Sequence, residues 1–132
     1  MADKISDIKG MDAAMQAKMA AANIHTTDDL LAHAGTSAQR GALASQLGTT
    51  SAQLTEWVNR ADLMRLKGVG TEFANLLEDC GVDSCKELQH RVPANLHEKM
   101  VSVNEQKHIT HHAPSLSQVE DWIKEAATLA AK

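Results

Sequence analysis

Bulky aromatic side chains are almost absent from this chain of 132 residues, which has two Trp, one Phe and no Tyr. A β-sandwich or β-barrel fills its core with many more aromatic and β-branched residues. The apolar share of 43% comes largely from 21 Ala together with Leu and Met, side chains that lose little rotamer freedom in a helix. The composition therefore predicts an all-α fold.

Cysteine is scarce as well, since Cys80 and Cys85 are the only two and cannot form a disulfide framework. Their spacing is not that of a redox pair, so we expect both thiols to pack as small apolar groups. No stretch approaches the roughly 20 apolar residues of a membrane span, and residues 1–10 lack the apolar run of a signal peptide. We therefore expect a cytoplasmic protein with reduced thiols and no membrane partner.

Positive charge is not in excess. Thirteen Lys and Arg stand against seventeen Asp and Glu, which gives a net charge of −4 with His neutral. This balance excludes a strongly basic nucleic-acid binder, because such proteins gain affinity by releasing counterions from phosphate. It leaves open a weak or local contact. Residues 61–125 are the more acidic part, with seven Lys and Arg against eleven Asp and Glu.

The chain contains an internal repeat. A shift of 58 positions places Ile8–Met11 on Leu66–Val69, and a shift of 65 places Trp57 on Trp122. We expect two related halves, residues 5–62 and 63–130, packed as one compact unit of short helices. The second half has about seven extra residues within 104–112, and insertions in repeats often form binding loops.

Capping residues and apolar spacing predict the same series of helices in each half. In the first half we expect helices over residues 12–23 and 37–47. Thr26 or Thr27 should cap a short helix that runs through Leu31, and Thr50 or Ser51 should cap the Trp57 helix, which runs on into Leu63. In the second half the expected helices cover residues 71–80, 84–90, 94–107 and 115–130. Asn23 and Gly81 should end the first helix of each half in the left-handed conformation, and Pro93 and Pro114 should lie just before helix starts.

Leu66-Lys67-Gly68-Val69-Gly70-Thr71 is the stretch that carries chemistry. An apolar residue followed by Gly-apolar-Gly and an amphipathic helix is the pattern of a helix-hairpin-helix, whose glycines adopt conformations closed to other residues. The turn leaves N–H groups free at the start of its second helix, where the helix dipole also favours an anion. A nucleic-acid phosphate fits that place.

The same pattern also serves as a plain corner between packed helices, and the residues alone leave both interpretations open. For a nucleic-acid contact the candidate residues are Arg65, Lys67, Gly68, Val69, Gly70 and Thr71. In the first half Asp12 replaces the second glycine, so we expect its carboxylate to cap the following helix and to repel a phosphate. Glu72 is a second unfavourable charge. We therefore expect at most one of the two hairpins to bind a phosphate.

The sequence resembles the family named domain of unknown function 4332 in three features. These are the two-copy layout, the segment Trp57-Val58-Asn59-Arg60-Ala61-Asp62-Leu63 and the turn Gly68-Val69-Gly70. The resemblance covers residues 5–129. It implies a tandem helix-hairpin-helix architecture in a small prokaryotic protein, and it implies no established activity. The Met11-Asp12 turn departs from the Gly-apolar-Gly form that family members often show in the first copy.

His108, His111 and His112 form the densest polar cluster and lie within the insertion. If helical, their spacing suits a transition metal, but no Cys or carboxylate adjoins them at a recognised spacing. The residues favour a solvated loop over this weak metal candidate.

No enzyme motif is present, so we expect a non-enzymatic binding module without a cofactor. Its partner is either the backbone of DNA or RNA, contacted without sequence specificity at Gly68–Thr71, or a protein. In the second case the chain is an adaptor or assembly subunit and both hairpins are only structural corners. Trp57 and Trp122 are expected in the core.

Overall fold

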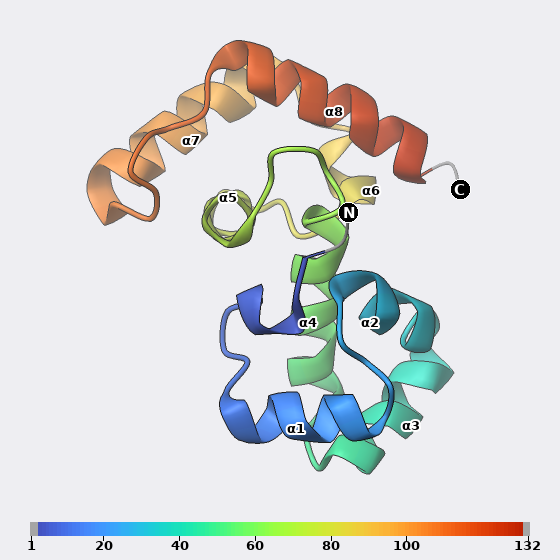
Figure 1. Ribbon diagram of the computed structural model, residues 1–132. Coiled ribbons are helices and arrows are strands. Elements are labelled where there is room, and N and C mark those ends of the chain that lie inside the picture. The colour runs from blue at the N-terminus through green and yellow to red at the C-terminus, as the bar shows by residue number, and fades with distance from the viewer. Residues whose placement is uncertain (1–2, 131–132) are drawn as a thin grey trace. The chain divides into compact units, whose positions relative to one another are not determined.

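The computed structural model describes residues 3–130, which form eight α-helices, one 3-10 helix and no extended strand (Figure 1). The elements are η1 (Ile5–Asp7), α1 (Ala13–Ala21), α2 (Thr27–His33), α3 (Ser37–Leu47), α4 (Ser51–Leu63), α5 (Thr71–Asp79), α6 (Cys85–Leu88), α7 (Pro93–Lys107) and α8 (Leu116–Ala130). The predicted all-α fold is confirmed. None of these helices is both long and apolar enough to cross a membrane.

The chain divides into two compact units, Met1–Arg65 with η1 and α1–α4, and Leu66–Lys132 with α5–α8. The sequence led us to expect one compact unit with its halves meeting after Asp62, whereas this division falls after Arg65. Two units form because each half contains its own Trp-bearing helix to pack around. In the first unit α4 packs on α2 and α3, and in the second α8 packs on α6 and α7.

Helix starts in the first unit follow the capping residues. The hydroxyl of Thr26 accepts a hydrogen bond from the Asp29 N–H, and Thr36 and Thr50 cap α3 and α4 in the same way. The backbone N–H groups of His25 and Thr26 donate to the Asp29 carboxylate, which lowers its pKa. These caps satisfy N–H groups that a helix cannot pair internally. Of the two candidate caps at each start, Thr26 and not Thr27 caps α2, and Thr50 and not Ser51 caps α4.

Two helices of the second unit begin or end differently from the expectation. The helix expected over 84–90 is only Cys85–Leu88, because the chain turns after Leu88 and the Arg91 guanidinium folds back to donate to the Gly81 carbonyl. Pro93 is the first residue of α7 and does not precede it. Its missing N–H is harmless there, since the first N–H groups of a helix have no internal partner.

The first helix of each unit ends in the same way. Asn23 and Gly81 have positive φ values of 64° and 88°. Beyond them the Ile24 N–H donates to the Met19 carbonyl, and the Val82 N–H to the Leu77 carbonyl, both with N···O distances of 2.9 Å. This is the hydrogen-bond pattern of a left-handed helix cap, and the prediction for both residues is confirmed.

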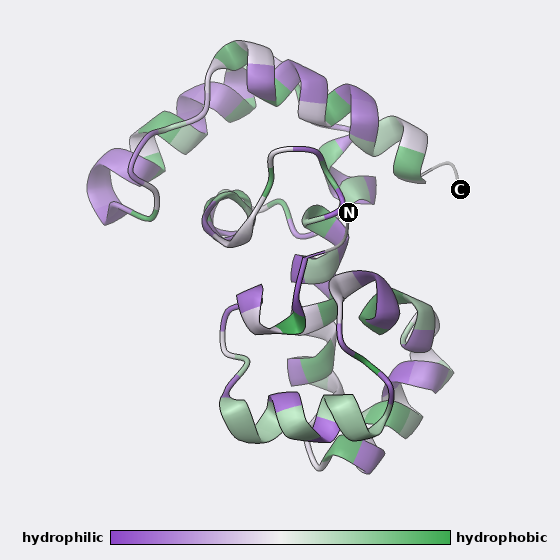
Figure 2. Ribbon diagram, in the orientation of Figure 1, coloured by the Kyte–Doolittle hydropathy of each residue, from purple (hydrophilic) through white to green (hydrophobic). Residues whose placement is uncertain are grey.

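Both tryptophans lie in the core, as predicted, with exposed fractions of 4% for Trp57 and 2% for Trp122. Methionine side chains also fill the core, since Met11, Met19, Met64 and Met100 are buried and Met15 is half-buried. Hydrophobic and hydrophilic positions alternate along α8, as expected of a helix with one buried face (Figure 2).

Replacing Leu77 by Ala should lower the free energy of unfolding by about 2–5 kcal/mol, because the side chain is fully buried in α5 and its loss leaves a cavity. Leu116→Ala is the matched control, since Leu116 begins α8 and is 42% exposed. Urea unfolding followed by circular dichroism measures both changes. Equal losses in the two variants would contradict the packing described for the second unit.

Candidate nucleic-acid interface

The turn between Leu66 and α5 has a defined backbone shape. Gly68 has a φ of +86°, a conformation that strains any residue with a side chain. The Val69 N–H donates to the Leu66 carbonyl at 3.1 Å, and both of these side chains are buried. Gly70 is extended and immediately precedes α5. The Val69 side chain thus fills the core beneath the turn, while Lys67 and Gly68 are exposed.

Helix α8 holds this turn through the peptide groups of a single residue. The Trp122 indole N–H donates to the Lys67 carbonyl with an N···O distance of 3.0 Å. The Lys67 N–H donates to the Glu125 carboxylate at 2.9 Å. The Trp122 ring also packs against Phe73 in α5, with ring centroids 5.1 Å apart. The turn is therefore fixed from both sides of Lys67 by one face of α8.

The start of α5 keeps hydrogen-bond donors available. Gly70 has no side chain, so α5 has no side-chain cap. Within residues 3–130 the N–H groups of Gly68 and Gly70 donate to no other group. Two backbone donors and an exposed Lys67 therefore lie at the positive end of the α5 dipole.

Arg65 contributes less charge than the sequence suggested, because its guanidinium is paired with the Asp62 carboxylate. The cationic side chain left at the turn is Lys67, which makes no ion pair with any described residue. Of the candidate residues named from the sequence, the turn brings together Lys67, Gly68, Val69, Gly70 and Thr71.

The corresponding turn of the first unit has the same backbone shape and a different polar environment. Gly10 also has a φ of +86°, and the Met11 N–H donates to the Ile8 carbonyl at 3.2 Å. The Asp12 carboxylate accepts a hydrogen bond from the Met15 N–H at 2.8 Å. The prediction that Asp12 caps its own helix is confirmed. A negative charge thus occupies the place that Gly70 leaves open in the second unit.

The two tryptophans differ in their polar contacts. The Trp57 indole nitrogen is buried and has no hydrogen-bond partner among the described residues, although it lies beneath Gly10, at 3.5 Å from the position of a Cβ on that residue. The Trp122 nitrogen has the corresponding place beneath Gly68 and donates to Lys67. A hydrogen bond from the tryptophan to the turn is therefore present in the second unit alone.

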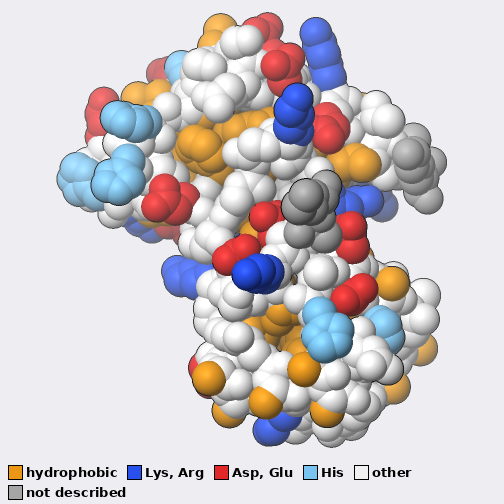
Figure 3. Space-filling model, viewed as in Figure 1, with side chains coloured by type: hydrophobic (Ala, Val, Ile, Leu, Met, Phe, Trp, Pro, Cys, Tyr) orange, Lys and Arg blue, Asp and Glu red, His pale blue; other side chains and the backbone are white. Residues whose placement is uncertain are grey.

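The histidine cluster lies in an ordered loop. Helix α7 ends at Lys107, and His108 has a positive φ of 51°, so the helical spacing needed for the weak metal candidate His108, His111 and His112 is not formed. Figure 3 shows histidine side chains gathered at the loop between α7 and α8. Across residues 3–130 no three His, Cys, Asp or Glu side chains are arranged to hold a metal ion.

Sequence reasoning missed two residues that shape these features. Glu125 accepts the Lys67 N–H from 58 positions away, and no local pattern marks such a contact. Asn104 lies in the α7 sequence like any polar residue, yet its side chain is buried and bonds both backbone groups of Thr110. The sequence signal for this role is an Asn near the expected end of a helix, followed by a short polar loop whose backbone groups need hydrogen-bond partners.

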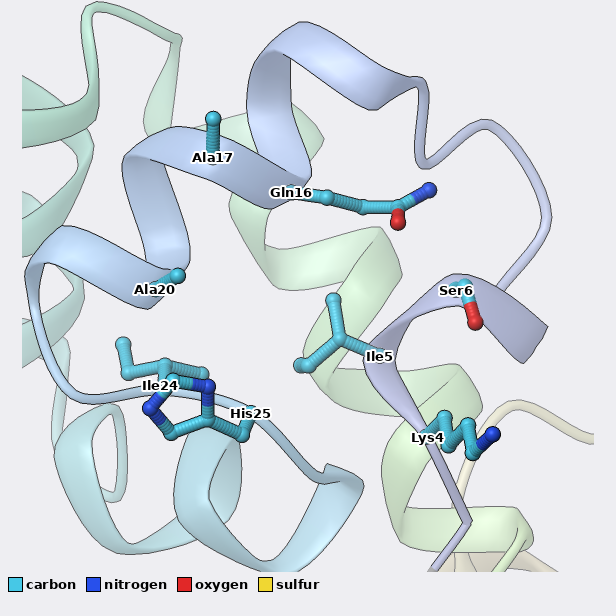
Figure 4. Close-up of a pocket in the computed structure, with 8 residues that line it drawn as sticks. All are labelled: Lys4, Ile5, Ser6, Gln16, Ala17, Ala20, Ile24 and His25. Carbon is cyan, nitrogen blue, oxygen red and sulfur yellow. The ribbon is translucent and has the colours of Figure 1, made fainter.

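The first unit has a hollow of about 370 Å³ between η1, α1 and the loop before α2 (Figure 4). Ile5 and Ile24 form its aliphatic floor. The Lys4 side chain points away from both isoleucines (Figure 4), and the Gln16 amide donates to the Met11 carbonyl.

The chain belongs to the family described as Domain of unknown function (DUF4332), whose model matches residues 9–129. Membership in this family is what the resemblance of the sequence implied. Comparison with curated proteins and with solved structures gives no match. The protein is therefore an all-α member of that family.

Trp122→Phe should destabilise the second unit by about 1 kcal/mol, because the Lys67 carbonyl loses its hydrogen-bond donor while the aromatic packing largely remains. Trp57→Phe is the matched control and removes an indole nitrogen that has no partner. Urea unfolding of both variants gives the two losses. If Trp57→Phe costs as much as Trp122→Phe, the contact to Lys67 does not stabilise the turn.

Cys80 and Cys85 are not joined in a disulfide and are both fully buried, and burial raises the pKa of the Cys80 thiol. The thiolate is the reactive form of cysteine, so neither thiol should react with a disulfide reagent at pH 8 in the folded protein. Both should react rapidly in 6 M guanidinium chloride. Rapid reaction of either thiol in the native state would show that it is not buried as described.

Proposed function

We propose that this chain is a non-catalytic binding module that contacts the backbone of nucleic acid, without reading bases, through the turn Gly68-Val69-Gly70. The observation that carries the proposal is the uncapped start of α5, where the Gly68 and Gly70 N–H groups donate to no group within residues 3–130. A phosphate oxygen is the ligand that such a group of donors at a helix start accommodates best. Lys67 adds a charge-assisted contact, and Thr71 adds a hydroxyl.

The proposal includes a tandem helix-hairpin-helix arrangement in which the two units are copies. It is supported by Gly10 and Gly68, each with a φ of +86°, and by the tryptophan nitrogen beneath each glycine. In this arrangement the second hairpin alone binds phosphate. Asp12 neutralises the start of α1 and repels an anion there.

Neighbouring carboxylates set the strength of this contact. Glu125 lies against the Lys67 N–H, and Glu72 is exposed in the first turn of α5. Both oppose a phosphate through Coulomb repulsion that salt only partly screens. The module is therefore a weak, salt-sensitive binder. We further propose that it acts in the cytoplasm of a prokaryote, where cysteine thiols such as those of Cys80 and Cys85 stay reduced.

One observation favours a protein partner as the second candidate. The part of the chain that carries the open turn is acidic, with seven Lys and Arg against eleven Asp and Glu in residues 61–125, and Glu125 adds a carboxylate at the turn itself. In this alternative the chain is an adaptor or assembly subunit. The Gly68 and Gly10 turns are then only corners between packed helices.

Lys67→Glu should weaken binding to a fluorescein-labelled DNA duplex by about tenfold at low salt and reduce the salt slope by about one, since one phosphate contact is lost. Lys9→Glu is the matched control, because it makes the same charge change at the turn that Asp12 blocks. Fluorescence anisotropy at 20, 50 and 150 mM salt measures both variants.

Glu125→Gln separates the two candidates. The amide oxygen of Gln still accepts the Lys67 N–H, while the negative charge beside the turn is removed. DNA binding should then tighten about twofold to threefold. Absence of binding by the parent protein at 20 mM salt, or equal weakening by Lys67→Glu and Lys9→Glu, would defeat the nucleic-acid proposal and favour the adaptor.

A further inference from the structure

The loop that follows α7 is fixed by buried hydrogen bonds. The Thr110 N–H donates to the Asn104 side-chain oxygen at 2.8 Å, and the Asn104 amide nitrogen donates to the Thr110 carbonyl at 3.2 Å. The Thr110 hydroxyl donates to the His112 carbonyl at 2.6 Å. Asn104 and Thr110 are 9% and 7% exposed. Buried bonds of this kind hold a segment in one conformation, so the exposed His108 and His111 have defined positions.

This loop lies against the start of α5. A hollow of about 350 Å³ is lined by Glu72, His108, Ile109, Thr110 and His111. Glu72 is the second residue of α5 and follows the turn of Gly68–Thr71 directly. The two imidazoles therefore border the carboxylate that directly follows the turn at which the proposed function puts a phosphate.

The charged groups around the hollow can be assigned element by element. From α5 the hollow receives Glu72. At the end of α7, Lys107 is paired with Asp79 at 3.2 Å, and Glu105 lines a separate hollow with His97. The first turn of α8 has no charged residue. The charge around this hollow therefore depends on the Glu72 carboxylate and on the two histidines.

We propose that His108 and His111 form a pH-responsive extension of the phosphate-contacting surface, so that the protein binds a nucleic-acid backbone more tightly at pH 6 than at pH 8. This inference rests on the proposed function of the Gly68–Thr71 turn. Imidazole changes its charge between pH 5 and 8. Positive charge on the imidazoles of this loop opposes the Glu72 carboxylate and attracts the neighbouring phosphates of a backbone bound at the turn.

The test is the affinity for the same labelled DNA duplex at pH 6 and pH 8, at constant ionic strength and with a chelator present. The parent protein should bind about fivefold more tightly at pH 6, as expected for two added positive charges near a bound phosphate backbone. The double variant His108→Asn, His111→Gln should lose this difference. Asn is chosen at position 108 because it tolerates the positive φ found there.

His90→Gln, His97→Gln is the matched control, which removes two histidines of the same unit. His97 lies about 16 Å from His108 along the axis of α7, and it lines a different hollow. This control should keep the fivefold difference. Circular dichroism of each variant at both pH values verifies that the fold is retained.

Three outcomes overturn the inference in distinguishable ways. If the parent binds equally at both pH values while Lys67→Glu still weakens binding, the histidine loop is not part of the surface and the proposed function stands. If the His108, His111 variant keeps the pH dependence, or the control loses it equally, the effect belongs to other groups. If the parent binds at neither pH, the proposed function itself fails.

Discussion

The turn that precedes α5 depends on two hydrogen bonds from α8 to the peptide groups of Lys67. The Trp122 indole and the Glu125 carboxylate contact opposite sides of this one residue, and Phe73 extends the contact into α5. A turn held in this way keeps its shape whether or not a ligand is bound, which removes the ordering cost that a flexible loop incurs. The amides of Gly68 and Gly70 are thus preorganised donors.

The two turns differ in one side chain, that of Asp12, and this difference changes how well a helix start can accept an anion. Gly10 and Gly68 share the same positive φ, and each has a tryptophan nitrogen beneath it. At the next helix start, Asp12 accepts the Met15 N–H, whereas Gly70 leaves α5 without a cap. Since a helix start stabilises one nearby anion whatever its source, a carboxylate supplied by the chain itself competes with any phosphate. Two turns of one shape therefore have different binding potentials.

The sequence predicts those features that depend on neighbouring residues. The caps at Asp12, Thr26 and Thr50 bond to N–H groups three positions ahead, so residue type and spacing suffice to place them. The glycine conformations and the buried tryptophans follow from equally local patterns. The contact of Glu125 with Lys67 spans 58 positions, and no periodicity encodes it. The short α6 and the loop held by Asn104 depend on where Arg91 and Thr110 fold back, which is a property of packing and not of helix propensity.

The central claim is that phosphate binds at the backbone of the second turn and not of the first. Amide resonances in ¹H–¹⁵N correlation spectra test it most directly, during titration with a short DNA duplex at low salt. The account predicts the largest shifts at Gly68 and Gly70, which donate to no other described group, while Gly10 stays unchanged. Shifts of equal size at Gly10 and Gly68, or shifts confined to residues far from both turns, would contradict it.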